Sequence, residues 1–274
     1  MKTDWLHPVR TWRRRRATSV PFPREWDEIL ARNFPLDARL PERDRKELRK
    51  RIQIFIAEKH FEGLGGLKLT DEVRVTVAAQ ACLLLLHCGE KDYPRLSSIL
   101  VYPTAYKARE VSRSADGLVT EGEEVRLGEA WNLGAVVLSW HDVQFGAGDY
   151  HDGSNLVLHE FAHQLDMENN VANGAPLLPR RSMYVAWARV LGREYEHLRQ
   201  EVEKNHRTIM DRYGATNPAE FFAVATETFF EKPAQLHDRH PELYELLREF
   251  YRQDPRSYFT RPPGAGSPGS ETAG

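Results

Sequence analysis

Apolar residues recur with a helical period over most of the chain. In residues 41–61 they fall every three or four positions between charged residues, which predicts an amphipathic surface helix. Residues 69–88 become almost wholly apolar after a capping residue, Thr70 or Asp71, which predicts a helix in the core. Further helices are expected over residues 181–205, 217–231 and 241–252. The pattern therefore indicates a mainly helical protein.

Two short runs have the composition of β-strands. Residues 96–103 are rich in β-branched and aliphatic side chains and end at proline, and residues 134–143 form a second such run before a turn rich in glycine and aspartate. Residues 108–130, between the two runs, are polar and predict a hairpin or loop. A helix is expected to begin near Ser154 or Asn155. The elements together favour an α+β fold with a small sheet.

The two ends of the chain differ from the rest. Residues 1–22 are basic, and we expect them to lie over the surface as an extension whose charges are mainly solvated. Residues 262–274 are rich in glycine, proline and serine, and we expect a disordered tail. Residues 23–261 are then expected to form one domain, with an N-terminal helical part to about residue 90 and a second part over 91–261.

Composition limits the functions that need to be considered. The net charge is -2 and 28% of the residues are charged, with both signs present, so the charge gives no reason to expect direct binding of nucleic acid. No apolar run reaches the roughly 20 residues that a membrane-spanning helix needs, and no apolar core follows the N-terminal arginines. Cys82 and Cys88 lie in or beside the apolar helix and are expected to be reduced. We therefore expect a cytoplasmic protein.

The sequence HEFAHQLD at residues 159–166 predicts a catalytic metal site. On a helix, His159 and His163 lie one turn apart on the same face, so both imidazoles can bind one Zn²⁺ ion. Glu160 follows the first histidine, where it can take a proton from a zinc-activated water. A chance match is the alternative, but the motif falls within a predicted helix and its other positions form an apolar face: Leu156, Val157, Phe161, Ala162 and Leu165.

The motif supplies two ligands, whereas a hydrolytic zinc site has three protein ligands and one open position. The known continuation HExxHxxGxxH is excluded, because Asp166 and Asn169 occupy its glycine and last histidine positions. The best source of a third ligand is the apolar helix within residues 213–233, which carries Glu220 and Glu227 two turns apart on one face. Carboxylates on a buried helix are costly unless they are paired or bound to metal.

Each glutamate has a second explanation. Asn217 and Pro218 suit the cap and first position of a helix, so Glu220 at the third position can close a capping box onto the backbone. Glu227 can bind the metal, or it can accept a hydrogen bond from the second ring nitrogen of a histidine ligand. The residues alone leave both glutamates open as the third ligand.

Three motifs together resemble the Mlc titration factor A family of zinc-dependent peptidases: HEFAHQLD, YGATNPAEFFAVATETFFEKP and HPELYELLREFYRQDP. The resemblance covers about residues 20–257. This family is similar to the catalytic domain of anthrax lethal factor-type metalloproteases, in which the third zinc ligand is a glutamate seven residues after a tyrosine that faces the substrate oxyanion. Tyr213 and Glu220 match that spacing. The resemblance therefore implies Glu220 as the ligand, Tyr213 as the oxyanion donor and Glu227 as the support of a histidine.

The resemblance also implies a gluzincin-like fold, in which an edge strand precedes the zinc-binding helix and accepts an extended peptide substrate. On that reading Trp140, His141 and Asp142 can line the cleft, although ordinary strand and turn positions explain them equally well. Asp166 can orient His163 or make a helix-end hydrogen bond.

The function that the resemblance implies is an aminopeptidase-like activity, with a DNA-binding repressor of glucose-transport genes as a further partner. One alternative is a regulatory protein that mainly sequesters this repressor and has weak or conditional peptidase activity. Another is a purely structural zinc site, which predicts four protein ligands and no exchangeable water.

Overall fold

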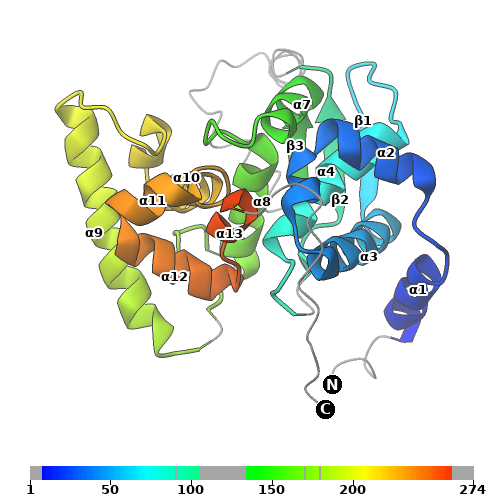
Figure 1. Ribbon diagram of the computed structural model, residues 1–274, viewed down its shortest axis with the longest axis horizontal. Coiled ribbons are helices and arrows are strands. Elements are labelled where there is room, and N and C mark those ends of the chain that lie inside the picture. The colour runs from blue at the N-terminus through cyan, green and yellow to red at the C-terminus, as the bar shows by residue number, and fades with distance from the viewer. Residues whose placement is uncertain (1–7, 90–91, 105–133, 170, 179, 261–274) are drawn as a thin grey trace.

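The computed structural model describes residues 8–89, 92–104, 134–169, 171–178 and 180–260. The helices α1–α4 and the sheet lie on one side of the molecule, the helices α9–α12 lie on the other, and α8 runs between them (Figure 1). The helices and short 3-10 turns are α1 (Pro8–Thr18), α2 (Arg24–Asn33), η2 (Pro35–Arg39), α3 (Glu42–Glu58), α4 (Asp71–Leu84), α7 (Trp140–Gly148), α8 (Leu156–Asp166), η3 (Met167–Asn169), α9 (Met183–Glu203), η4 (Arg212–Ala215), α10 (Pro218–Glu231), α11 (Pro233–Arg239), α12 (Pro241–Tyr251) and α13 (Arg256–Thr260).

Three short strands form a parallel sheet in the order β1 (His60–Gly63), β2 (Ser98–Tyr102) and β3 (Ala135–Ser139). The apolar side chains at alternate positions of β2 and β3 are buried, as period-two alternation requires: Ile99, Val101, Val136 and Leu138. Within the described residues β3 is an edge strand, and it precedes the helix that carries the histidines, as expected. The mainly helical architecture with a small sheet is confirmed.

The second predicted strand, 134–143, is correct only in its first half. The strand ends at Ser139, and residues 140–148 form α7 instead of strand and turn. The hydroxyl of Ser139 accepts a hydrogen bond from the backbone N–H of Asp142 and so caps this helix. The β-branched and aromatic residues that continue the run therefore do not continue the strand.

The N-terminal half differs from expectation at β1 and α1, and no element was predicted over residues 23–40, where α2 and η2 form. The helix predicted over residues 41–61 ends at Glu58, and His60–Gly63 form the unpredicted strand β1 beside β2. Within residues 1–22, where no helix was expected, Pro8–Thr18 form α1. Arg14 donates two hydrogen bonds to the carboxylate of Glu58, at 2.6 and 3.0 Å, so that α1 is attached to the end of α3. The segments predicted over 108–130 and 262–274 lie outside the described residues.

Three predicted helix starts agree with the structure. Thr70 caps α4, Asn155 caps α8, and Asn217 caps α10 with Pro218 at the first helical position. The helices α11 and α13 were not predicted, because each is only one to two turns long. Cys82 and Cys88 are not joined by a disulfide bond, and Cys82 is buried.

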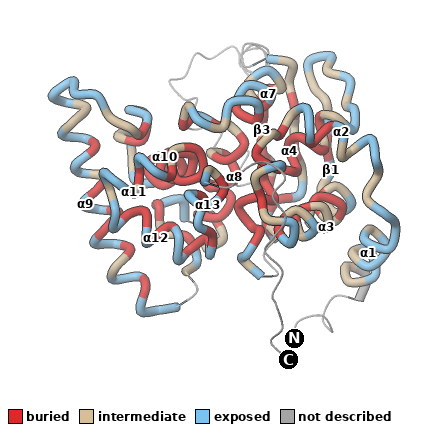
Figure 2. Tube along the Cα trace, viewed as in Figure 1, coloured by how far each residue is buried: buried red, intermediate tan, exposed pale blue. Residues whose placement is uncertain are grey.

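Buried side chains are concentrated in α4, α8 and α10 (Figure 2). On one side of α8, the ring of Phe161 packs against Phe55 and Tyr93, with ring centroids 5.8 and 4.8 Å apart. On the other side, α10 packs along α8 and contributes Phe222 to a cluster with Trp187 and Phe250. The histidine-bearing helix is therefore held between two apolar clusters. In the described part of the chain, no helix combines the length and apolarity needed to cross a membrane.

Candidate metal centre

The two histidines of HEFAHQLD lie on the face of α8 that meets α10. Their Nε2 atoms are 3.1 Å apart, and the two rings meet nearly edge to face. His163 is fully buried, whereas the side chain of His159 is 14% exposed to solvent. One edge of the pair is therefore accessible from solvent while the other is sealed by the core.

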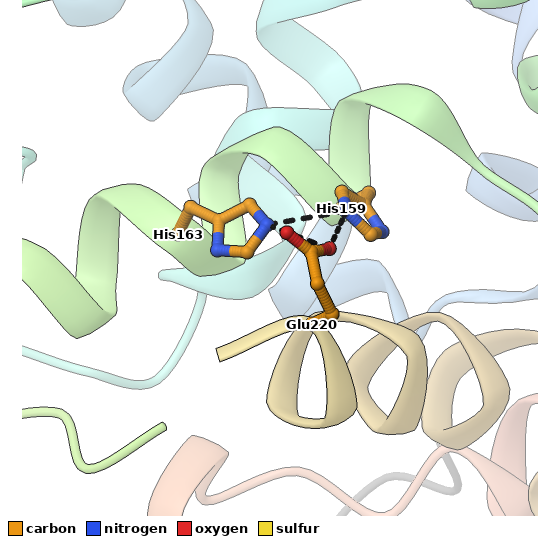
Figure 3. A group of neighbouring side chains, drawn as sticks. All are labelled: His159, His163 and Glu220. Atoms are coloured by element: carbon orange, nitrogen blue, oxygen red, sulfur yellow. Dashed lines mark hydrogen bonds and ion pairs between the residues drawn. The ribbon is translucent and has the colours of Figure 1, made fainter. Parts of the chain in front are cut away.

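Glu220 completes a cluster with these histidines from the first turn of α10 (Figure 3). Its Oε2 atom lies 2.9 Å from Nε2 of His159 and 3.3 Å from Nε2 of His163. The backbone N–H of Glu220 donates a hydrogen bond of 3.0 Å to the side chain of Asn217, the cap of α10. The Glu220 carboxylate is not part of the cap and faces α8. The alternative of a capping box closed by the Glu220 carboxylate is therefore not what the structure contains.

The donor set fits a zinc ion. In a tetrahedral site with bonds of about 2.0–2.2 Å, ligand atoms lie roughly 3.3 Å from one another. The three distances in this cluster, 2.9, 3.1 and 3.3 Å, are near that value. Imidazole nitrogen and carboxylate oxygen are both ordinary zinc ligands. Among the described residues, this is the group of three such side chains that can hold one ion.

The side chains of the cluster shift one another's pKa values. Burial lowers the pKa of its imidazole, but hydrogen bonds to Glu220 and Glu227 outweigh burial and raise the pKa to about 10. Burial raises the pKa of Glu220, but the two histidines outweigh it and lower the pKa to about 2. The carboxylates of Glu220 and Glu227 therefore stabilise positive charge at His159.

Glu227 lies on α10 two turns after Glu220 and contacts the other edge of the His159 ring. Its Oε1 atom is 2.8 Å from Nδ1 of His159, the ring nitrogen that does not face Glu220. Its Oε2 atom accepts a hydrogen bond of 2.5 Å from the backbone N–H of Asn155. Of the two uses left open for this carboxylate, the geometry matches support of a histidine ring.

Glu231 is a third buried carboxylate on the same face of α10, and the sequence interpretation missed it. It accepts hydrogen bonds of 3.0 Å from the Asn155 side chain and from the backbone N–H of Gly153. Burial raises its pKa to about 9, although the bond from Asn155 opposes that rise. The available signal was its spacing of four residues from Glu227 on an otherwise apolar helix.

Glu160 and Tyr213 both lie beside the cluster. Glu160 is 4% exposed, and its charge contributes to the raised pKa of His159. Tyr213 is 47% exposed, and its ring centroid is 6.0 Å from that of His159. It stands on η4, where Gly214 packs so closely that an added Cβ would lie 3.2 Å from side chains of Leu198 and Val224. The tyrosine ring thus lies beside His159, the more exposed of the two histidines.

The remaining candidates lie in other settings. Asp166 accepts a hydrogen bond of 2.7 Å from the backbone N–H of Gly174, which attaches the loop after α8. Trp140, His141 and Asp142 form the first turn of α7, where His141 is exposed and bonded to Asp142 at 2.9 Å. Other histidines pair with acids or pack on rings, as surface and packing residues do: His151, His206, His237 and His240.

Comparison with known proteins agrees with this site. The family model described as glucose-regulated metallo-peptidase M90 matches residues 9–252. The chain is 45% identical over 246 residues to the uncharacterized protein slr2042 of Synechocystis sp. (strain ATCC 27184 / PCC 6803 / Kazusa), covering 89% of each chain. It is 36% identical over 242 residues to the Mlc titration factor A proteins of Serratia proteamaculans (strain 568) and Yersinia pestis (strain Pestoides F), covering 86% of this chain and 90% and 87% of theirs. With its His159, His163 and Glu220 cluster, the chain belongs to the M90 family of glucose-regulated metallopeptidases.

Proposed function

We propose that this chain is a zinc-dependent peptidase in which His159, His163 and Glu220 hold one Zn²⁺ ion. The observation that carries the proposal is the convergence of three ligand atoms, 2.9–3.3 Å from one another, from two buried helices. A purely structural site needs a fourth protein ligand, and among the described residues the cluster has three. The donor set therefore supports a site with an open position.

Bound zinc supplies a Lewis acid that polarises a carbonyl and lowers the pKa of a water to about 7. In the proposed reaction, Glu160 takes the proton of the attacking water and passes it to the leaving amine. Tyr213 donates its phenolic hydrogen to the oxyanion that forms on the scissile carbonyl. The exposure of Tyr213 and the position of its ring beside His159 support that role. Glu227 keeps Nε2 of His159 directed at the ion by holding Nδ1.

Metal analysis combined with peptidase assays tests this proposal. The purified chain should contain about one zinc ion, lose hydrolysis of small aminopeptidase substrates on chelation, and regain it when zinc is returned. Glu160→Gln should keep the zinc and reduce kcat by about 10²–10⁴-fold. Glu196→Gln, an exposed glutamate of α9, is the matched control and should retain the wild-type rate. A chain that hydrolyses equally well without metal would refute the zinc mechanism.

The names of the relatives support a second part of the proposal. Two of them are named Mlc titration factor A. We propose that this chain likewise binds a DNA-binding repressor of glucose-transport genes, in the cytoplasm, without touching nucleic acid itself. If binding the repressor is the main role, Glu160→Gln should still bind it and still produce the cellular phenotype. If peptidase activity is the main role, the variant should bind but fail to restore the phenotype.

A further inference from the structure

We propose that Asn155 is a positioning residue that sets the direction in which His159 presents Nε2 to the metal. The inference rests on the proposed zinc site. It adds a residue that does not contact the Nε2 and Oε2 atoms proposed to bind the metal. Asn155 is 3% exposed and stands between α7, α8 and α10. Its role follows from where each of its polar groups is bound.

Every polar group of Asn155 is used within the site. Its Oδ1 atom accepts a hydrogen bond of 3.0 Å from the N–H of Leu158, and its backbone carbonyl accepts one of 2.9 Å from the N–H of His159. Its Nδ2 group donates to the carbonyl of Gly146 and to Oε1 of Glu231, both at 3.0 Å. Its backbone N–H donates to Oε2 of Glu227 at 2.5 Å. One residue thus begins the ligand-bearing helix and joins it to both neighbouring helices.

The two oxygens of Glu227 connect Asn155 to the histidine ring. One oxygen is held by the backbone N–H of Asn155, and the other lies 2.8 Å from Nδ1 of His159. The plane of the carboxylate is therefore fixed at both oxygens, and a displacement of Asn155 rotates the group that orients the ring. Outer hydrogen bonds of this kind fix the tautomer and direction of a ligating histidine.

The two hydrogen bonds donated by Nδ2 of Asn155 hold this residue in place through Gly146 and Glu231, which are not proposed ligands. Glu231 also accepts a hydrogen bond from the N–H of Gly153, so three hydrogen bonds attach the segment leading into α8 to Glu231 and Glu227 of α10. On the other side α7 approaches so closely that a Cβ added to Gly146 would lie 3.0 Å from Cα of Asn155. Asn155 is therefore held by hydrogen bonds to α7 and α10 and by close packing against Gly146.

A simple capping role does not account for these contacts. Asn217 caps α10, the other ligand-bearing helix, and its side chain is bonded at Oδ1 to the N–H of Glu220. Serine caps helices about as well as asparagine. Asn→Ser at either position therefore keeps the cap, whereas at 155 it also removes the Nδ2 bonds to α7 and α10.

Zinc affinity, measured by competition with a chromophoric chelator, tests the inference on the full chain. Asn155→Ser should weaken zinc binding about 10-fold, the lower end of the range for removing outer hydrogen bonds at metal sites. Asn217→Ser should change the affinity by less than about twofold. The absorption spectrum of the Co²⁺-substituted chain should shift in Asn155→Ser and not in Asn217→Ser, because it reports ligand geometry rather than stability.

Two further variants keep the test decisive if Asn155→Ser folds poorly. Gly146→Ala presses on Cα of Asn155 and should weaken zinc binding, whereas Gly148→Ala on the same helix meets open space and should not. Glu231→Ala removes both acceptors and should weaken binding too, and its effect should add only in part to that of Asn155→Ser, because both variants remove the bond between Asn155 and Glu231.

Different results would contradict the positioning role of Asn155 and the proposed zinc site. Wild-type zinc affinity and an unshifted Co²⁺ spectrum in Asn155→Ser and Gly146→Ala would overturn the positioning role and leave the proposed zinc site intact. A wild-type chain that binds neither metal would instead overturn the proposed site, and this inference with it.

Discussion

Nδ1 of His159 lies 2.8 Å from Oε1 of Glu227, on the edge of the ring opposite Glu220. A carboxylate accepts hydrogen bonds, so when Nε2 binds a metal this contact holds the remaining ring proton on Nδ1. The most exposed of the three candidate ligands is thus oriented by a residue that is itself buried.

Replacing Glu227 should weaken the metal site without removing a ligand. In Glu227→Gln the side chain offers one acceptor in place of two, while both His159 and Asn155 present a donor. We expect zinc affinity to fall about 10–100-fold, measured by chelator competition. Glu196→Gln provides the control. Complete loss of zinc binding would show instead that Glu227 is itself a ligand.

Removing the phenol of Tyr213 should slow the chemical step. Tyr213→Phe keeps the ring beside His159 but loses the proposed oxyanion donor. Because the donor acts mainly in the transition state, kcat should fall on the order of 10²–10³-fold with little change in KM or zinc content. Tyr184→Phe, an exposed tyrosine of α9, should behave as wild type. A rise in KM of the same size, with kcat unchanged, would indicate that the hydroxyl of Tyr213 acts in substrate binding instead.

Zinc binding should release about one proton at neutral pH. The pKa of His159 is about 10 in the metal-free site, so its imidazole is charged at pH 7 and must lose a proton to bind the ion. The apparent affinity should therefore rise with pH, by up to about tenfold per unit, and fall as the medium becomes acidic. Calorimetry in buffers of different ionisation enthalpy measures the released proton directly. Heats that do not depend on the buffer would contradict this prediction.

The loop after α8 should be sensitive at Gly174. This residue has φ +75°, and a Cβ added to it would lie 2.4 Å from the carbonyl oxygen of Pro218 at the start of α10. Its N–H binds Asp166 and its carbonyl accepts a hydrogen bond from Trp187. Gly174→Ala should lower the free energy of unfolding by at least about 3 kcal/mol.

Gly66→Ala provides the matched control in urea unfolding experiments. Gly66 has φ +85° but nothing within 4 Å of the added Cβ, so only the left-handed backbone should cost energy, about 1 kcal/mol. Equal effects of the two substitutions would show that the contact with Pro218 is relieved by movement of the loop.

The sequence by itself determined the features that depend on neighbouring residues. The spacing of His159 and His163 requires one turn of helix, and Asn217 with Pro218 fixes where the second helix begins. Short elements escaped prediction, because β1 is defined by pairing with β2 and α7 by its cap at Ser139. Local propensity is too weak to decide such cases alone.

Only the tertiary structure decided which glutamate lies at the Nε2 atoms of the histidines and which lies at Nδ1. Glu220 and Glu227 lie two turns apart on one apolar helix, and residue chemistry left either of them open as a ligand. The packing of α10 along α8 brings Glu220 to the Nε2 atoms of both histidines and Glu227 to the far edge of one ring. A contact between residues about 60 positions apart is set by how two helices pack, and no local pattern encodes that.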